Sequence, residues 1–156
     1  MMRRTIVLLI VIIMAVSLCS CTSRNESVSD KIKSDFVSAE LQIKMNDYTN
    51  FVWDTLIIYR NPITVEEINE VGDIDYKGKL DLTDGMIFVN KGQVVYEETF
   101  LTDFETPHEF MIFPYIEGYH NKEHINVFTP KTAVFNGTKQ NYNGEHDYYT
   151  LYPVAS

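Results

Sequence analysis

Two histidines and a glutamate are the residues whose types and spacing come nearest to catalytic chemistry. They lie in the string His120-Asn121-Lys122-Glu123-His124, which matches His-x-x-Glu-His, an inverted zinc-peptidase motif. Two histidines four apart share a zinc ion only on one helix, and here the string leads directly into the strand-like run 125–128. Only 32 residues follow His124 to supply a third ligand. We therefore expect a solvated loop without metal, and keep as an alternative a metal-dependent or cell-wall hydrolase built on His120, Glu123 and His124.

Acidic residues gather before two glycines in the middle of the chain. Asp73 and Asp75 resemble part of a calcium loop, but the bidentate glutamate that such a loop needs is missing from the spacing. Asp81 and Asp84 are typical of residues that form a turn ahead of a strand. We expect charged, solvated turns here and no calcium site.

A third acidic group, Asp103, Glu105 and Glu109, has the residue type used in sugar hydrolysis. With 22 acids in the chain, such near neighbours are expected by chance, so a solvated face is the expectation. His108 and His146 flank other turns, where a surface site of two or three histidines has no further support. The sequence contains no Gly-x-Ser-x-Gly motif, phosphate-binding glycine loop or dinucleotide fingerprint. We expect no catalytic residue and no cofactor.

Tyrosines are the most prominent candidate binding residues. Four of the ten, Tyr142, Tyr148, Tyr149 and Tyr152, lie close to the end of the chain. In a strand, Tyr148 and Tyr152 share one face with Thr150, whereas Tyr149 lies on the other. We expect these rings to pack against the sheet, since tyrosine suits a half-buried strand. An exposed aromatic strip that stacks on sugars or docks a protein is the alternative.

The N-terminal residues have the features of a bacterial signal peptide. Two arginines precede an uncharged apolar run over residues 6–18, which as a helix is roughly 20 Å long and too short to span a bilayer. The run ends in Leu18-Cys19-Ser20-Cys21, which resembles a lipobox, with the small Ser20 at the cleavage position. We expect residues 1–21 to form a lipoprotein signal cleaved before Cys21, with Cys21 as the lipid attachment site. An ordinary cleaved signal is the alternative.

Lipidation of Cys21 has consequences for the compartment and for the cysteine chemistry. Several acyl chains anchor a protein firmly, so we expect a palmitate-type membrane anchor on Cys21 in the cell membrane or outer membrane, facing the periplasm or exterior. Cys19 leaves with the signal and Cys21 becomes a thioether, so no free thiol and no disulfide remains. The formal net charge of −9 disfavours nucleic acid as a partner.

Composition and patterning divide the remaining chain into two parts. Residues 22–34 are rich in serine and charge and predict a flexible tether. Residues 35–156 predict a single globular domain, since 45% of the chain is apolar. In residues 36–45 both helical and alternating periods are present, and the helix-forming residue types favour a helix.

The domain is expected to be α+β, with one or two short helices near its N-terminal side and one largely antiparallel sheet of six or seven strands. A capping box of Thr64 and Glu67 predicts a helix over 65–71 that ends at Gly72. Turns are predicted at Asn136-Gly137 and Asn143-Gly144. The predicted strands are 51–59, 86–89, 94–100, 110–116, 125–128, 133–135 and 148–152.

Part of the chain resembles a group of small, functionally uncharacterised bacterial lipoproteins. The shared pattern is a Trp-Asp opening an apolar strand, a Pro-containing turn, a short helix ending in Gly and an apolar hairpin. In this chain these are Trp53-Asp54, Leu56-Ile57-Ile58-Tyr59, Pro62, the segment 68–72 and Phe88-Val89-Asn90-Lys91-Gly92-Gln93-Val94-Val95. The resemblance implies a lipoprotein and no enzyme activity. We expect the Trp53 ring to pack and the Asp54 carboxylate to accept hydrogen bonds from turn amides.

Together these features indicate a non-enzymatic envelope lipoprotein that presents a small binding domain outside the cytoplasmic membrane. Its partner is expected to be an envelope or extracellular protein, a peptide or a glycan, through residues that the sequence does not single out. The alternatives are the hydrolase described above and an immunity-type or structural lipoprotein of an envelope complex.

Overall fold

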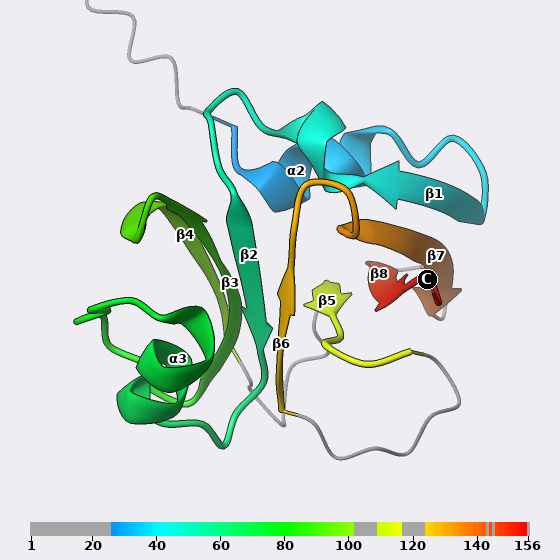
Figure 1. Cartoon of the computed structure of the whole chain (residues 1–156). Coiled ribbons are helices and arrows are strands. Elements are labelled where there is room, and N and C mark those ends of the chain that lie inside the picture. Colours follow the sequence, from blue (N-terminus) through cyan, green and yellow to red (C-terminus); the bar gives the residue numbers. More distant parts are fainter. Residues whose placement is uncertain (1–25, 102–108, 117–123, 143, 145, 156) are drawn as a thin grey trace, which may run out of the picture.

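The computed structural model describes residues 26–101, 109–116, 124–142, 144 and 146–155 (Figure 1). In chain order the elements are α2 (Val28–Ser34), β1 (Glu40–Lys44), the 3-10 helix η1 (Met45–Tyr48), β2 (Thr55–Tyr59), α3 (Val65–Gly72), β3 (Thr83–Asn90), β4 (Gln93–Leu101), β5 (Phe110–Ile112), β6 (Ile125–Phe128), β7 (Val134–Tyr142) and β8 (His146–Pro153). Among these residues no helix has both the length and the apolar character needed to cross a bilayer.

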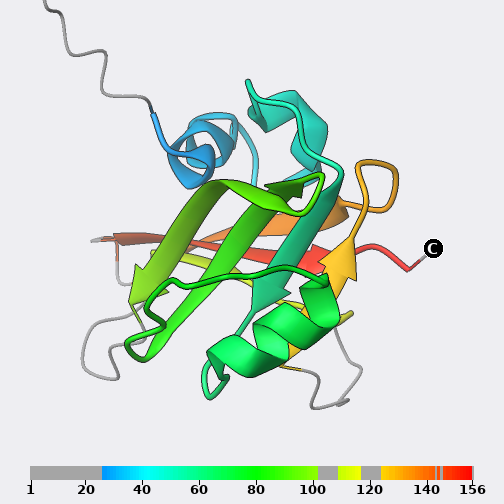
Figure 2. The same cartoon turned by 60° about the vertical axis from the view of Figure 1, so that its left-hand side comes forward.

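The described strands form two sheets of four rather than the single sheet of six or seven that we expected. Sheet A has the order β1-β7-β8-β5 and sheet B the order β4-β3-β2-β6. All pairs are antiparallel except β5 with β8, so the expectation of largely antiparallel pairing with short helices is confirmed. The two sheets face each other in Figures 1 and 2.

A hydrophobic core between the sheets explains why one sheet was the wrong expectation. Leu56 and Ile58 of β2 are fully buried in this core, together with Phe135 of β7 and Leu151 of β8. Consecutive strands do not simply pair along the chain, because β1 pairs with β7 and β2 pairs with β6. Strands far apart in sequence therefore supply the two facing layers.

A second core lies on the opposite face of sheet B, beneath α3. Ile57 and Tyr59 of β2 belong to it together with Ile68 of α3. The strand β2 therefore buries both of its faces, which is why its sequence is apolar on both sides. Figure 2 shows α3 lying across this outer face of sheet B.

Helix α3 begins as the sequence predicts. The Thr64 hydroxyl accepts a hydrogen bond from the Glu67 amide at 3.2 Å, and the Glu67 carboxylate accepts one from the Thr64 amide at 2.8 Å. The predicted end is one residue early, because the left-handed residue is Asp73 (φ 49°) and Gly72 is still helical. Gly72 serves close packing instead: a Cβ there would lie 2.5 Å from Cδ1 of Ile57.

The predicted hairpin of β3 and β4 is confirmed and extends further at both strands than expected. Its two-residue turn is Lys91-Gly92, in which both residues have positive φ (53° and 75°). Turns of this type match the twist of the paired strands. The Asp54 carboxylate accepts a hydrogen bond from the Lys91 amide at 2.7 Å, and Trp53 is buried with its ring edge-to-face on Phe88. Both expectations for Trp53-Asp54 are therefore confirmed.

The predicted tether is wrong from Val28 onward, because Val28–Ser34 forms α2 and packs on the main core. Val28 and Ile32 are 1% and 0% exposed. The Ser27 hydroxyl caps the helix by accepting a hydrogen bond from the Asp30 amide. Two apolar residues four apart are enough for a helix that is held by tertiary contacts, although the surrounding serines and charges are typical of a linker. Residues 22–25 of the predicted tether lie outside the described residues.

The helix predicted over residues 36–45 is also wrong. Residues Glu40–Lys44 form β1, whose inward residue Ile43 is fully buried, and the 3-10 helix η1 follows. Pairing with β7 selects the alternating period over the helix-forming residue types, because tertiary burial outweighs local propensity.

Two expectations in the C-terminal half need correction. Asn136-Gly137 is not a turn but lies inside β7, paired with β1 and β8. Gly137 is needed for packing, since a Cβ there would lie 2.6 Å from side-chain atoms of both Ile43 and Phe36. The strand predicted over 110–116 is only Phe110–Ile112. Gly144, with φ 76°, lies in the predicted turn between β7 and β8.

Candidate functional site

The outer face of sheet A carries a set of uncharged polar and aromatic side chains. Strand alternation turns Ile43, Phe135 and Leu151 into the core, so the residues between them point outward. Register places Gln42, Asn136 and Tyr152 side by side in one row, and Thr138 beside Thr150 in the next. Tyr148 follows on the same side of β8. We call this set of Gln42, Asn136, Thr138, Tyr148, Thr150 and Tyr152 the amide–tyrosine face.

Four of these side chains have hydrogen-bonding groups that the protein itself does not use. Within the described part of the chain, the side chains of Gln42, Asn136, Thr138 and Thr150 form no hydrogen bond to another protein group. Gln42 and Asn136 are exposed, and Thr138 and Thr150 are half-buried. Amides and hydroxyls both donate and accept, so the face can bind a ligand that does the same.

A shallow hollow lies on this face between β1 and β7. It has a volume of about 420 Å³ and is lined by Glu40, Leu41 and Gln42 of β1 and by Asn136, Gly137 and Thr138 of β7. Volumes of this order are typical of small-molecule sites. The described helices contact other elements: α3 packs on β2 and β6, and α2 packs on η1. The hollow is therefore not covered by either helix.

The Tyr152 ring is fixed by a series of contacts that reaches sheet B. It stacks on Phe113, with ring centroids 4.5 Å apart and planes at 3°. The Arg60 guanidinium lies 4.4 Å from the centroid of the Phe113 ring. Arg60 in turn is paired with Asp84 of β3 through an Nε–Oδ2 distance of 2.9 Å. These contacts fix the orientation of the Tyr152 ring.

The ion pair of sheet A lies on the side opposite to the amide–tyrosine face, because Lys139 and Asp147 alternate in step with the core residues Phe135 and Leu151. Lys139 and Asp147 form an ion pair at 2.8 Å, and Asn141 donates to the other Asp147 oxygen at 2.9 Å. The hydrogen bonds from Asn141 and Lys139 lower the pKa of Asp147, and the hydrogen bond to Asp147 raises the pKa of Lys139. Both groups therefore keep opposite charges near neutral pH. Although the whole chain carries −9, the outward row contributes only Glu40 and Lys44 as charged residues of β1.

The proposed metal motif is largely outside the described residues. His120 and Glu123 are not described, and His124 is exposed. The backbone carbonyl of His124 accepts a hydrogen bond from the Arg60 amide at 2.7 Å. No group of three or more His, Cys, Asp or Glu residues in the described ranges is arranged to hold a metal ion. Two of the three residues of the motif therefore lie outside the described residues.

The other candidate acids have separate roles. Asp73 ends α3, and Asp75 is an exposed partner of Lys77 at 2.9 Å. Asp81 lies in the turn before β3, as expected. Asp84 does not: it lies within β3, its side chain is only 10% exposed, and it accepts hydrogen bonds from Arg60 and from the Asn61 amide. The expectation of a turn former at Asp84 is wrong, because Arg60, directly after β2, and the Asn61 amide supply donors to a carboxylate inside β3.

Several predicted residues cannot be placed. Cys21, Asp103, Glu105 and His108 lie outside the described residues, as does the side chain of Tyr142. Glu109 is exposed, and His146 is exposed at the start of β8.

The alternation of tyrosines in the last strand predicted which of them belong to the amide–tyrosine face. Tyr149 packs edge-to-face on Phe36 toward the core, whereas Tyr148 and Tyr152 lie on the outer side with Thr150, as alternation predicts. Gln42, Asn136 and Thr138 were not identified from the sequence. The alternation of polar and apolar residues in 40–44 was a usable signal that Gln42 points outward. The pairing of this segment with β7 could not be predicted, because Asn136-Gly137 resembles a turn in the sequence.

Comparison of the chain with protein-family models, with curated proteins and with solved structures finds no match.

Proposed function

We propose that this chain is a lipid-anchored envelope protein whose domain binds neutral glycans through the amide–tyrosine face. The anchor is the lipidated Cys21 expected from residues 1–21. The observation that carries the binding proposal is the row Gln42, Asn136 and Tyr152, which combines unpartnered amides with a stacked aromatic ring.

Sugars present hydroxyls that both donate and accept hydrogen bonds, together with apolar ring faces. Amide side chains match the hydroxyls, and tyrosine rings present an apolar surface with a polar edge. An ionic ligand fits less well, because the two outward charged residues of β1, Glu40 and Lys44, have opposite signs. The acidic net charge further disfavours polyanions.

The proposed activity is binding and not cleavage. Hydrolysis of a glycosidic bond needs two carboxyl groups on either side of the bond. Among the described residues that line the hollow, Glu40 is the single carboxylate. A protein that only binds a glycan strand beside the membrane needs no second carboxylate.

The test is calorimetric titration of the mature protein with neutral cell-wall oligosaccharides, using N-acetylglucosamine oligomers as the probe. Tyr152→Ala and Asn136→Ala are each expected to weaken binding about tenfold, because each removes interactions worth about 1.4 kcal/mol. Thr99→Ala, an exposed change on β4 of the other sheet, is the matched control and should leave affinity unchanged. Equal affinity in all four proteins, or binding of a cationic peptide alone, would contradict the glycan proposal.

A separate experiment tests the anchor. Cys21→Ala is expected to abolish incorporation of labelled palmitate and to release the protein from the membrane fraction, since no other cysteine remains after cleavage. Identical fractionation of Cys21→Ala and the parent chain would overturn the lipoprotein proposal and leave the glycan test unaffected.

A further inference from the structure

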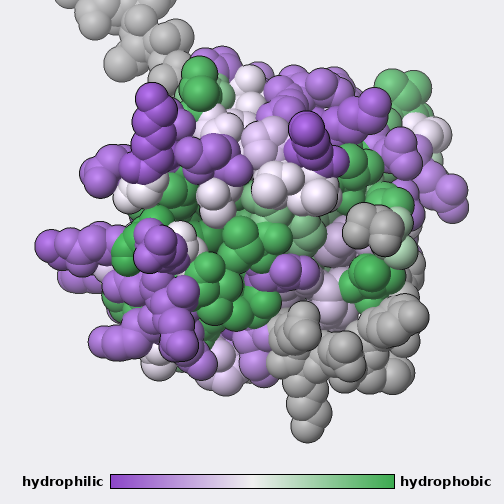
Figure 3. All heavy atoms as spheres, in the orientation of Figure 1, coloured by the Kyte–Doolittle hydropathy of each residue, from purple (hydrophilic) through white to green (hydrophobic). Residues whose placement is uncertain are grey.

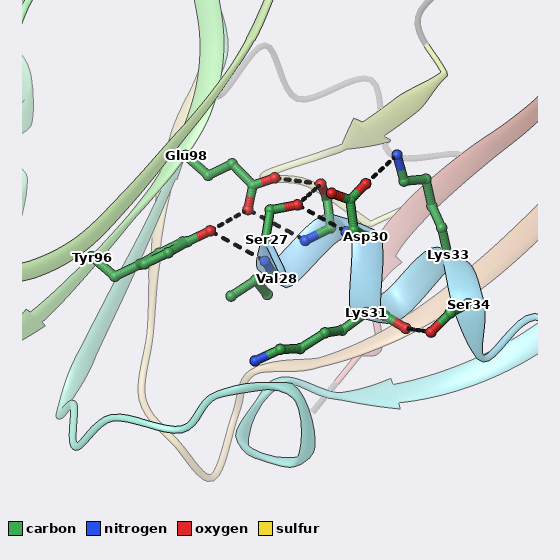
Figure 4. A network of polar contacts seen from close by, with 9 residues as sticks. Ser27, Val28, Asp30, Lys31, Lys33, Ser34, Tyr96 and Glu98 are labelled. Carbon is green, nitrogen blue, oxygen red and sulfur yellow. Dashed lines mark hydrogen bonds and ion pairs between the residues drawn. The ribbon is translucent and has the colours of Figure 1, made fainter. Parts of the chain in front are cut away.

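The start of α2 is fixed to the body of the domain by a network of hydrogen bonds (Figure 4). The Val28 amide donates to the Tyr96 hydroxyl at 3.1 Å, and that hydroxyl donates to Glu98 at 2.8 Å. The Ser29 hydroxyl and amide both donate to the Glu98 carboxylate. The point at which the chain enters the domain is therefore held against β4.

This entry point limits how far the domain can lie from its anchor. Seven Cα–Cα steps separate Cys21 from Val28 and span at most about 25 Å when fully extended. Because α2 is part of the domain and not of a tether, the α2 end must stay close to the lipid surface in a protein anchored at Cys21. Figures 1 and 2 place the loop after α2 and the loop between η1 and β2 at this same end.

Contacts between the segments confirm that this end is one continuous surface. Lys31 of α2 donates to the carbonyl of Tyr48 in η1 at 3.3 Å. Tyr96, which binds the start of α2, stacks on Phe51 with centroids 5.1 Å apart. The bond from Lys91 to Asp54 places the β3–β4 hairpin turn next to the same loop.

Several exposed apolar side chains lie at this end, apart from one another. Val37 follows α2 and is 99% exposed, and Val52 lies in the loop before β2 and is 76% exposed. Val94 and Val95, beside the hairpin turn, are 40% and 41% exposed. These four make up most of the large apolar residues that are exposed in the described ranges. Figure 3 shows a mainly hydrophilic surface at this end with separate hydrophobic groups projecting from it.

We propose that the α2 end of the domain rests on the bilayer, with Val37 and Val52 inserted among the lipid headgroups. This inference rests on the proposed anchor at Cys21. A lipid-anchored domain meets its own membrane at a high effective concentration, so a few exposed valines are sufficient to bias its orientation. The bilayer is the occupant favoured here, because the chain to the anchor ends at this surface and is short.

The test uses the mature lipidated protein in vesicles of phosphatidylcholine and phosphatidylglycerol. Val37→Cys and Val52→Cys, each carrying a nitroxide label, are expected to be accessible to oxygen and protected from an aqueous nickel complex. Leu82→Cys is the matched control: Leu82 is 73% exposed but precedes Thr83, at the opposite end of β3 from the residues that pair with the start of β2. Its label should remain accessible to nickel.

The single tryptophan gives a second readout that needs no substitution. Trp53 follows Val52 directly, so brominated lipids are expected to quench its fluorescence in vesicles. Equal nickel accessibility at positions 37, 52 and 82, with no quenching of Trp53, would overturn the inference. Labelling of the parent protein with a thiol reagent separates failure of the anchor from failure of this inference. A lipidated Cys21 takes up no thiol label, whereas an unmodified Cys21 does.

Discussion

Asp84 connects the two sheets through three successive contacts. Its carboxylate binds Arg60, the Arg60 guanidinium lies over Phe113, and Phe113 stacks on Tyr152. The carboxylate also accepts the Asn61 amide, so a single side chain of β3 stabilises the turn after β2 and the aromatic edge of the candidate face. A buried acceptor with two donors is a position where loss of the side chain is costly.

Replacing Asp84 by alanine is therefore expected to lower the free energy of unfolding by about 2–3 kcal/mol, because Arg60 and the Asn61 amide lose their acceptor in a poorly solvated place. Chemical denaturation monitored by Trp53 fluorescence measures the change. Asp81→Ala, an exposed change three residues earlier, should stay within about 0.5 kcal/mol of the parent. Equal effects of the two substitutions would show that the Asp84–Arg60 contact contributes nothing.

At the scale of single elements, local signals predicted those parts whose hydrogen bonds are local. The capping box of α3 joins residues three apart, and the hairpin turn Lys91-Gly92 depends on two adjacent residues with positive φ. Both were predictable because the partners are close in sequence. The β-branched and aromatic residues predicted β6 at its observed bounds, whereas the strand predicted over 51–59 began four residues too early, since β2 is Thr55–Tyr59.

The elements that the sequence misassigned depend on distant partners. Ile43 is buried because β1 pairs with β7, which lies more than ninety residues later along the chain. Gly137 resembles a turn residue locally, but it is required where Ile43 and Phe36 approach the strand. Asn136, a member of the candidate face, was hidden by the same local resemblance. No period or propensity carries that information, so this part of the site was not predictable.

The capping box allows a direct test at the element scale. Thr64→Ala is expected to cost about 1 kcal/mol of stability, since the Glu67 amide loses its acceptor at the helix start. Glu66→Gln, in the same first turn but outside the box, is the comparison variant and should cost a few tenths of that amount. Urea unfolding of both variants gives the difference, and a Thr64 variant as stable as the parent would mean that α3 is held by packing alone.

At the scale of the whole molecule, fully and partly buried tyrosines link stability to alkaline pH. Burial raises the pKa of Tyr48, Tyr59 and Tyr96 to about 12, and burial also raises that of Tyr76. The unfolded chain loses these protons near its ordinary pKa of about 10, while the folded chain still holds them. The stabilisation is therefore complete below about pH 10 and is lost as the pH rises through about 12.

Tyrosinate absorbance and unfolding followed together would measure this linkage. We expect part of the ten tyrosines to ionise near their ordinary pKa and the remainder to ionise only as the fold is lost. Reversible ionisation of all ten near pH 10, with the fold retained, would contradict the burial of these rings.

The wide separation of paired segments also sets an order of events during synthesis. Helix α2 is held by Tyr96 and Glu98, which follow their partners Val28 and Ser29 by 68 and 69 residues. Strand β1 pairs with β7, which lies still later in the chain. Until β4 has been synthesised, α2 therefore lacks the two side chains that fix its first turn. We therefore expect the N-terminal part of the domain to reach its final packing only after the C-terminal strands β7 and β8 have been synthesised.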